Sequence, residues 1–174
     1  EKENEPRIVE LSENKNEENE FINTIIEKSS NEIQSDFYDK RKKGENDSYI
    51  AELIRQDLID DFIIYVNQNN IQLSNLIERS TFETNSILLK NKEVSLIEYA
   101  AFYGSIQIFK YLEINKVELK PSLWFYAIHS RNPEIIAFLE EKNIEEHDLK
   151  TECIWLKEAV KCHHNEIANY IIEQ

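Results

Sequence analysis

The stretch Ser95–Leu112, SLIEYAAFYGSIQIFKYL, decides the fold. It contains two short apolar segments separated by Gly104, one of only two glycines in 174 residues. Ser95 followed by Glu98 is the capping-box pattern that opens a helix. A glycine suits the left-handed residue at which a helix ends. The stretch therefore predicts a pair of helices joined at Gly104.

The same pattern recurs twice toward the C-terminus. EYAAFYGSIQIFKYL aligns with FYAIHSRNPEIIAFL at a shift of 27 residues, which places Ala100 on Ala127. A further shift of 32 residues places Ala127 on Ala159 in KEAVKCHHNEIANYI. In the middle copy, Asn132 is expected to cap the second helix and Pro133 to lie in its first turn.

A weaker copy lies upstream, where LIRQDLIDDFIIY places Ile59 on Ile106. We therefore expect about four helix pairs over residues 49–174, clearest over 95–174. A single pair cannot bury its apolar face alone, which is why such units repeat and stack. Trp124 and Trp155 fall at core positions of this pattern.

The other segments complete an all-α prediction, because no alternating strand pattern occurs. Residues 1–16 are expected to be a flexible acidic arm. Residues 17–48 are expected to hold an additional N-terminal helix followed by the basic loop KRKKGENDS, from Lys40 to Ser48. Ser80 and Glu83 form a second possible capping box, weakened by the poor helix formers that follow it.

The Ser95–Leu112 unit resembles an ankyrin repeat, whose pattern is T-P-L-H-x-A-A-x-x-G followed by a second amphipathic helix. Ser95 takes the threonine place, Ala100 and Ala101 the alanine pair, and Gly104 the glycine. The sequence of the unit also resembles that of an uncharacterised ankyrin-like domain family expanded in protists. The resemblance covers about residues 50–174 and implies an ankyrin-like helix-pair solenoid.

The chain departs from the ankyrin pattern in two respects. Leu96 and Leu123 replace the proline, while Arg131 and His163 replace the glycine at a cost of about 1 kcal/mol each if left-handed. The 27-residue unit is also about six residues shorter than an ankyrin repeat, between Leu112 and Ser122. The β-hairpin fingers are therefore expected to be short or missing.

Composition excludes several classes of function. With 34 acidic and 20 basic residues, the formal net charge of −14 repels phosphate backbones and anionic lipids, so no nucleic acid and no membrane is expected as a partner. No apolar run approaches the ~20 residues of a membrane span, and no signal peptide is expected in the acidic start. Two cysteines without a CxxC pairing suit a reducing compartment.

The ankyrin resemblance implies which residues face a partner. The two residues before each glycine position would lie on the inner concave surface. By position these are the partner-binding candidates Phe102, Tyr103, His129, Ser130, Lys161 and Cys162. An exposed aromatic ridge suits an interface. For Phe102, packing under the segment from Leu88 to Val94 is an equally open alternative.

No catalytic, cofactor-binding or metal-binding residue is predicted. Cys162, His163 and His164 are of the types that ligate zinc, but adjacent residues on a helix point about 100° apart, and no carboxylate or second cysteine completes a recognised spacing. His129 and Cys153 could approach from neighbouring repeats. Motifs of hydrolases, P-loop proteins, zinc proteases and dinucleotide-binding proteins are absent from the sequence.

The sequence thus predicts a non-enzymatic protein–protein interaction module, acting as a monomer or weak homo-oligomer. The alternative is a structural or oligomerising module that uses the N-terminal helix, and a remote third reading is an undetected enzyme or metal-binding protein. The predicted compartment is the cytoplasm. The basic run from Lys40 leaves the nucleus open, although a solvated loop is the preferred interpretation.

Overall fold

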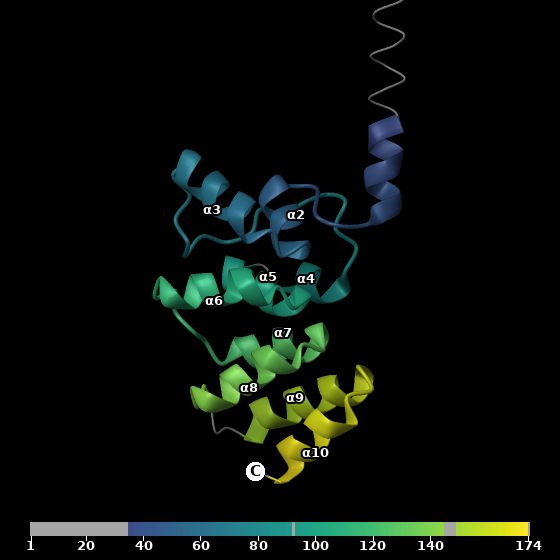
Figure 1. Ribbon diagram of the computed structural model, residues 1–174. Coiled ribbons are helices and arrows are strands. Elements are labelled where there is room, and N and C mark those ends of the chain that lie inside the picture. The colour runs from purple at the N-terminus through teal and green to yellow at the C-terminus, as the bar shows by residue number, and fades with distance from the viewer. Residues whose placement is uncertain (1–34, 92, 145–148, 174) are drawn as a thin grey trace, which may run out of the picture. The chain divides into compact units, whose positions relative to one another are not determined.

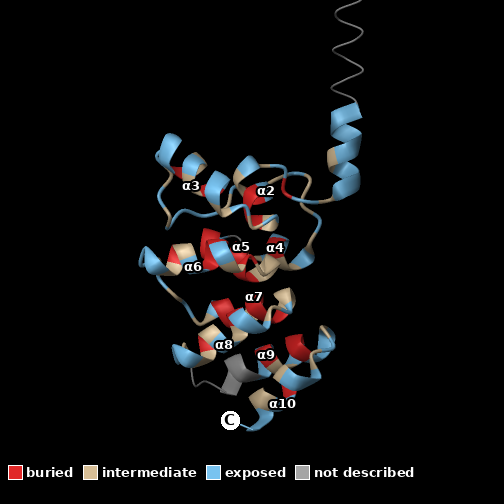
Figure 2. Cartoon of the chain, in the orientation of Figure 1, coloured by how far each residue is buried: buried red, intermediate tan, exposed pale blue. Residues whose placement is uncertain are grey.

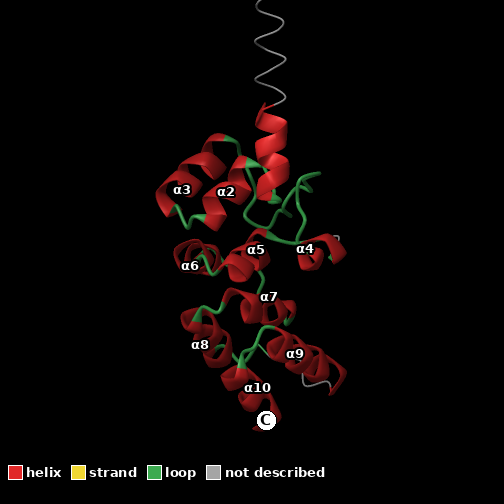
Figure 3. Ribbon diagram, turned by 90° about the vertical axis from the view of Figure 1, so that its right-hand side faces the viewer, coloured by secondary structure: helices red, strands yellow, loops and turns green. Residues whose placement is uncertain are grey.

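A computed structural model describes residues 35–91, 93–144 and 149–173. These residues form helices, turns and loops, and the described part of the chain has no strand (Figure 3). Its single β-bridge, between Leu76 and Ser95, is isolated. The all-α prediction is therefore confirmed. The chain divides into two compact units, residues 1–45 and 46–174.

In the first unit, the basic run predicted as a loop is partly helical. Residues 35–43 are helical, and the helix ends at Gly44, whose φ of 66° lies in the left-handed region. Lys40 pairs with Asp36 one turn earlier at 3.1 Å, a spacing that supports a helix. The loop thus begins at Gly44 rather than Lys40, because lysine and arginine are good helix formers. The predicted arm over 1–16 and most of the predicted N-terminal helix lie outside the described residues.

The second unit consists of helix pairs. Its helices are α2 (Tyr49–Arg55), α3 (Ile59–Gln68), α4 (Ser86–Lys90), α5 (Leu96–Tyr103), α6 (Ile106–Ile114), α7 (Ser122–Ser130), α8 (Pro133–Glu141), α9 (Leu149–Lys161) and α10 (Asn165–Glu173).

Eight of these helices form four pairs that lie one after another along the unit: α2 with α3, α5 with α6, α7 with α8 and α9 with α10 (Figure 1). The first helix of each pair contacts the first helix of the next pair, so that α2 contacts α5, α5 contacts α7 and α7 contacts α9. Helix α3 also contacts α6. The short helix α4 lies in the long connection between the first two pairs. The four predicted helix pairs are therefore present, and they are stacked.

The predicted caps of these helices are confirmed. The Ser95 side chain accepts a hydrogen bond from the Glu98 amide, and the Glu98 carboxylate accepts one from the Ser95 amide, which completes a capping box. The Asn132 side chain accepts from the Glu134 amide, and Pro133 is the first residue of α8. Local sequence thus sets where these helices begin.

The helix ends repeat one backbone geometry. The turn inside each pair contains a residue with φ between 52° and 74°, and the first three pairs end on another such residue with φ between 49° and 61°. The turn residues are Asp57, Gly104, Arg131 and His163, and the pair-ending residues are Asn70, Lys116 and Asn143. Arg131 and His163, which replace the glycine, are therefore left-handed and incur the backbone cost of about 1 kcal/mol each.

The turns also connect successive pairs. The Asp57 carboxylate accepts hydrogen bonds from the amides of Gln107 and Ile108, both at 3.0 Å, and so caps α6 from the preceding pair. The Asn132 side chain donates to the Gly104 carbonyl at 2.9 Å. Arg131 donates to the Cys162 carbonyl at 2.8 Å. These bonds align each pair with the next.

The core runs along the facing sides of the pairs, where the buried residues gather (Figure 2). Ile108, Phe109 and Leu112 of α6 are fully buried, and each such side chain contributes about 1.5–3 kcal/mol. Trp124 is 1% exposed and Trp155 6%, with ring centroids 5.6 Å apart. The prediction that both tryptophans belong to the core is confirmed.

The possible capping box at Ser80 and Glu83 is wrong. Ser80 lies in a loop, where its hydroxyl accepts from the Phe82 amide and contacts Asp47. Helix α4 begins later and is capped by Asn85, whose side chain accepts from the Ile87 amide at 3.0 Å. Asn is one of the residues preferred at this capping position, and the apolar run from Ile87 follows it within the helix.

The connection between the second and third pairs is short and contains no hairpin. Residues 115–120 carry no helix or strand. The Val117 amide donates to the Leu112 carbonyl and the Lys116 amide to the Glu113 carbonyl, which closes the end of α6. The prediction of a tight loop is confirmed.

Candidate functional site

The six predicted partner-binding residues lie at the C-terminal ends of the first helices α5, α7 and α9. Three of them form a row, which we call the ridge: Phe102, His129 and Cys162. The rings of Phe102 and His129 are 5.4 Å apart between centroids, and His129 Nδ1 lies 3.4 Å from Cys162 Sγ. Stacking of equivalent positions in three successive pairs produces this row.

The other three predicted residues have mainly local partners. Tyr103 packs against Tyr99 with centroids 4.8 Å apart, and burial raises its pKa. Ser130 donates to the Ala127 carbonyl at 2.8 Å and so belongs to the helix end. Lys161 pairs with Glu158 at 3.0 Å, with 55% of its side chain exposed. Only Lys161 of these three presents much surface to a partner.

Glu158, which the sequence analysis did not select, joins the ridge. Its carboxylate Oε1 lies 3.0 Å from His129 Nε2, and only 9% of its side chain is exposed. His129 is covered almost as well, at 14%. The signal in the sequence was the spacing of Glu158 and Cys162, four residues apart and therefore on one face of α9.

The electrostatics of this cluster favour uncharged side chains at two positions. Burial lowers the pKa of His129, while the neighbouring Glu158 opposes that shift. Burial raises the pKa of the Cys162 thiol, and Glu158 raises it further. Both directions favour the neutral imidazole of His129 and the protonated thiol of Cys162.

The order of thiol, imidazole and carboxylate is also that of a cysteine nucleophile with its base and orienting group. Two features of Cys162 oppose such chemistry. Its thiol pKa is raised rather than lowered, and it follows the C-terminal end of α9, where the helix dipole disfavours a thiolate. Both features disfavour a reactive thiolate at Cys162 in the metal-free chain.

A groove crosses the first helices beside the ridge. It has a volume of about 590 Å³ and receives side chains from α5, α7, α9 and the segment before α5. Its lining residues, which define the first-helix groove, are Asn91, Glu93, Glu98, Ser122, Phe125, Tyr126 and Ile154. None of these described residues is basic, and Ile154 is 46% exposed. The ring of Phe125 contacts His129, with centroids 5.7 Å apart, so groove and ridge adjoin.

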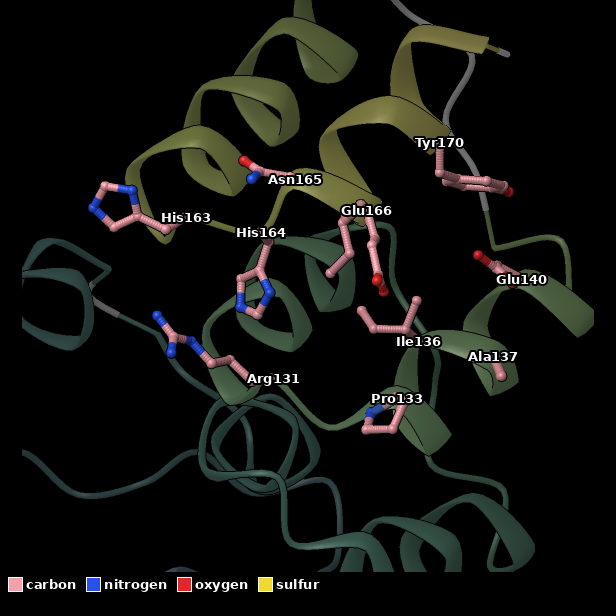
Figure 4. Close-up of a pocket in the computed structure, with 11 residues that line it drawn as sticks. Arg131, Pro133, Ile136, Ala137, Glu140, His163, His164, Asn165, Glu166 and Tyr170 are labelled. Carbon is pink, nitrogen blue, oxygen red and sulfur yellow. The ribbon is translucent and has the colours of Figure 1, made fainter.

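A second hollow of about 480 Å³ lies between the outer helices α8 and α10. Figure 4 shows Arg131 and His164 on one side of it and Tyr170 on the other. Arg131 is held by the Cys162 carbonyl, and burial lowers the pKa of His164. Glu140 and Glu166 add carboxylates, so the lining has mixed charge. None of the predicted site residues lines this hollow.

No family model, no curated protein and no solved structure matches this chain. Among the described residues, no helix is long and apolar enough to span a bilayer.

Proposed function

We propose that this chain is a non-enzymatic protein-binding module whose stacked helix pairs have an ankyrin-like arrangement. The observation that carries the proposal is the first-helix groove, which extends over three successive first helices and ends at the ridge. A surface assembled from the same position of adjacent units is how repeat proteins form extended binding faces. The partner would meet a preformed surface, which limits the ordering cost of binding.

The groove favours a basic partner segment with an apolar side chain. Glu93 is exposed at its edge, and Glu98 uses its carboxylate to accept hydrogen bonds from Ser95 and Ser122 rather than to pair with a cation. Phe125 and Ile154 supply the apolar part of the lining. With a net charge of −14, the whole chain attracts cationic partners.

The proposal is tested by quantitative capture of partners from a lysate of the source cells, using three forms of the chain. Ile154→Lys places a cation in the groove and should remove the captured partners. Ile114→Lys is the matched control, because Ile114 is 74% exposed on α6, away from the groove. Equal capture by all three forms, or equal loss in both variants, would reject the groove as the binding face.

The basic character of the partner has its own test. Glu93→Lys reverses one charge at the groove edge, so captured partners should bind more weakly than to the wild type at low salt. The difference should shrink as salt screens the charges. Partners that bind Glu93→Lys as well as the wild type would show that charge at this edge does not select them.

The second candidate function, self-association through the N-terminal unit, has one supporting observation. On the described helix over 35–43, Phe37 and Tyr38 are 47% and 58% exposed, which is unusual for neighbouring aromatic residues. Light scattering on the full chain and on a Phe37→Ser, Tyr38→Ser variant tests it. A dimer that becomes a monomer in the variant supports self-association, whereas two monomers oppose it.

A further inference from the structure

Three side chains with metal-binding chemistry converge between α7 and α9. One ligand atom from each of His129, Glu158 and Cys162 lies within 4.8 Å of the other two. The Cys162 amide donates to the Glu158 carbonyl at 2.9 Å, so the two residues lie one helical turn apart. Their side chains share a face, as do the two histidines of zinc sites with the same spacing. His129 reaches this face from α7.

The separations are close to those that one ion requires. Four-coordinate zinc has bonds of about 2.0–2.3 Å, which set about 3.3–3.6 Å between tetrahedral ligand atoms. An imidazole gives one ion only one of its two nitrogens. Cys162 Sγ lies 3.4 Å from His129 Nδ1, whereas Glu158 Oε1 lies 3.0 Å from the other nitrogen, Nε2. With one atom from each residue, all separations are within 4.8 Å, so the widest needs to contract by no more than about 1–1.5 Å, which side-chain rotation supplies.

The cluster is covered by the surrounding protein. His129 Nε2 is buried beside Glu158 Oε1, 3.0 Å away, and the side chains of His129 and Glu158 are only 14% and 9% exposed. Lys161 contacts the other carboxylate oxygen, Oε2, which leaves Oε1 directed at the imidazole.

We infer that His129, Glu158 and Cys162 form a binding site for one Zn²⁺ ion, with water in the fourth position. A thiolate with an imidazole selects zinc over magnesium or calcium, which prefer oxygen ligands. On binding, the S–H bond of Cys162 breaks, its proton passes to solvent, and a Zn–S bond forms without oxidation or reduction. The ion links the third helix pair to the fourth. This inference departs from the sequence-based expectation of no metal, because only the fold shows that His129 lies beside both Glu158 and Cys162.

Cobalt titration of the reduced, metal-free full chain tests the site. Tetrahedral Co²⁺ should give visible d–d bands and a thiolate-to-cobalt charge-transfer band that saturates at one ion per chain and disappears on addition of Zn²⁺. Cys162→Ser should abolish the charge-transfer band. Cys153→Ser is the matched control, because Cys153 is exposed on the same helix and should leave the band unchanged. Absence of the band in the wild type, or its equal loss in both variants, would overturn the inference.

Two further measurements do not depend on the Cys162 variant being folded. His129→Gln and Glu158→Gln should each weaken Zn²⁺ binding by at least about 100-fold, since loss of a mere supporting residue already costs 10–100-fold. The exposed neighbour His163→Gln should bind as the wild type does. In the wild type, Zn²⁺ should protect Cys162 but not Cys153 from alkylation, read by peptide mass. Equal alkylation of both cysteines at saturating Zn²⁺ would overturn the site.

Discussion

Replacing Gly104 by alanine tests how far the stack depends on its turns. The residue has φ of 74°, so any side chain there incurs the left-handed cost of about 1–2 kcal/mol. An added Cβ would also lie 3.3 Å from the Cβ atoms of both Ser130 and Asn132, tighter than ordinary contact. Those neighbours belong to the next pair, and Asn132 is held there by its bond to the Gly104 carbonyl.

The expected loss of unfolding free energy in Gly104→Ala follows from these contributions. The backbone cost of about 1–2 kcal/mol and crowding of about 1 kcal/mol are partly offset by about 0.5 kcal/mol, because alanine restricts the unfolded chain. The net loss is about 2 kcal/mol. With a denaturant dependence of about 2 kcal/mol per molar urea, the midpoint of unfolding falls by about 1 M.

Urea unfolding followed by far-ultraviolet circular dichroism measures this change. His163→Gly is the matched control, since His163 has φ of 58° at the equivalent turn and is exposed. Relief of the backbone cost of about 1–2 kcal/mol exceeds the effect of the freer unfolded chain, about 0.5 kcal/mol, so the His163→Gly midpoint should rise by about 0.3–0.8 M. A Gly104→Ala midpoint within about 0.3 M of the wild type would refute the argument that this turn requires glycine.

Three other substitutions test separate parts of the stack. Asp57→Ala removes the acceptor for two backbone amides at the start of α6 and should lower the unfolding free energy by about 1–2 kcal/mol. The control Asp61→Ala changes an exposed aspartate and should alter the unfolding free energy by less than about 0.5 kcal/mol. Equal urea midpoints for the two variants would contradict the cap between pairs. Ser95→Ala breaks the capping box and should cost about 1 kcal/mol in the same assay, so an unchanged midpoint would show that the box adds no stability. Burial, with the charge of Glu98, raises the pKa of Tyr126 to about 12 from 10.0. Between these values the unfolded chain has lost a proton that the folded chain keeps, so stability should fall as pH rises from 10 to 12. Tyr126→Phe should reduce that loss when urea midpoints are compared across this range, and an identical pH dependence would contradict it.

Local features of the fold could be predicted because short-range physics sets them. A capping box at Ser95 and an Asn-Pro start at Asn132 act over three or four residues, so sequence spacing alone identified both helix starts. The apolar spacing likewise placed Trp124 and Trp155 in the core. The prediction failed where two local signals competed, at Lys40 and at Ser80. At Lys40 the helix preference of lysine and arginine prevailed over the turn formers that follow. At Ser80 the outcome depended on a loop contact with Asp47, which spacing does not reveal.

The sequence by itself determined the helices, their turns and the repeat that makes them stack, because hydrogen-bonding caps, left-handed turn residues and apolar periodicity act within a few residues. Only the tertiary structure decided what that stack brings together. Glu158 and Cys162 are recognisable as neighbours on one helix face, but His129 lies about thirty residues earlier, and packing of α7 against α9 places its imidazole between them. Tyr103, which the sequence had assigned to an exposed surface, is half-buried against Tyr99 of its own helix and Arg55 of α2. A side chain's exposure and its distant partners depend on how helix faces pack, and no spacing within a single helix specifies that.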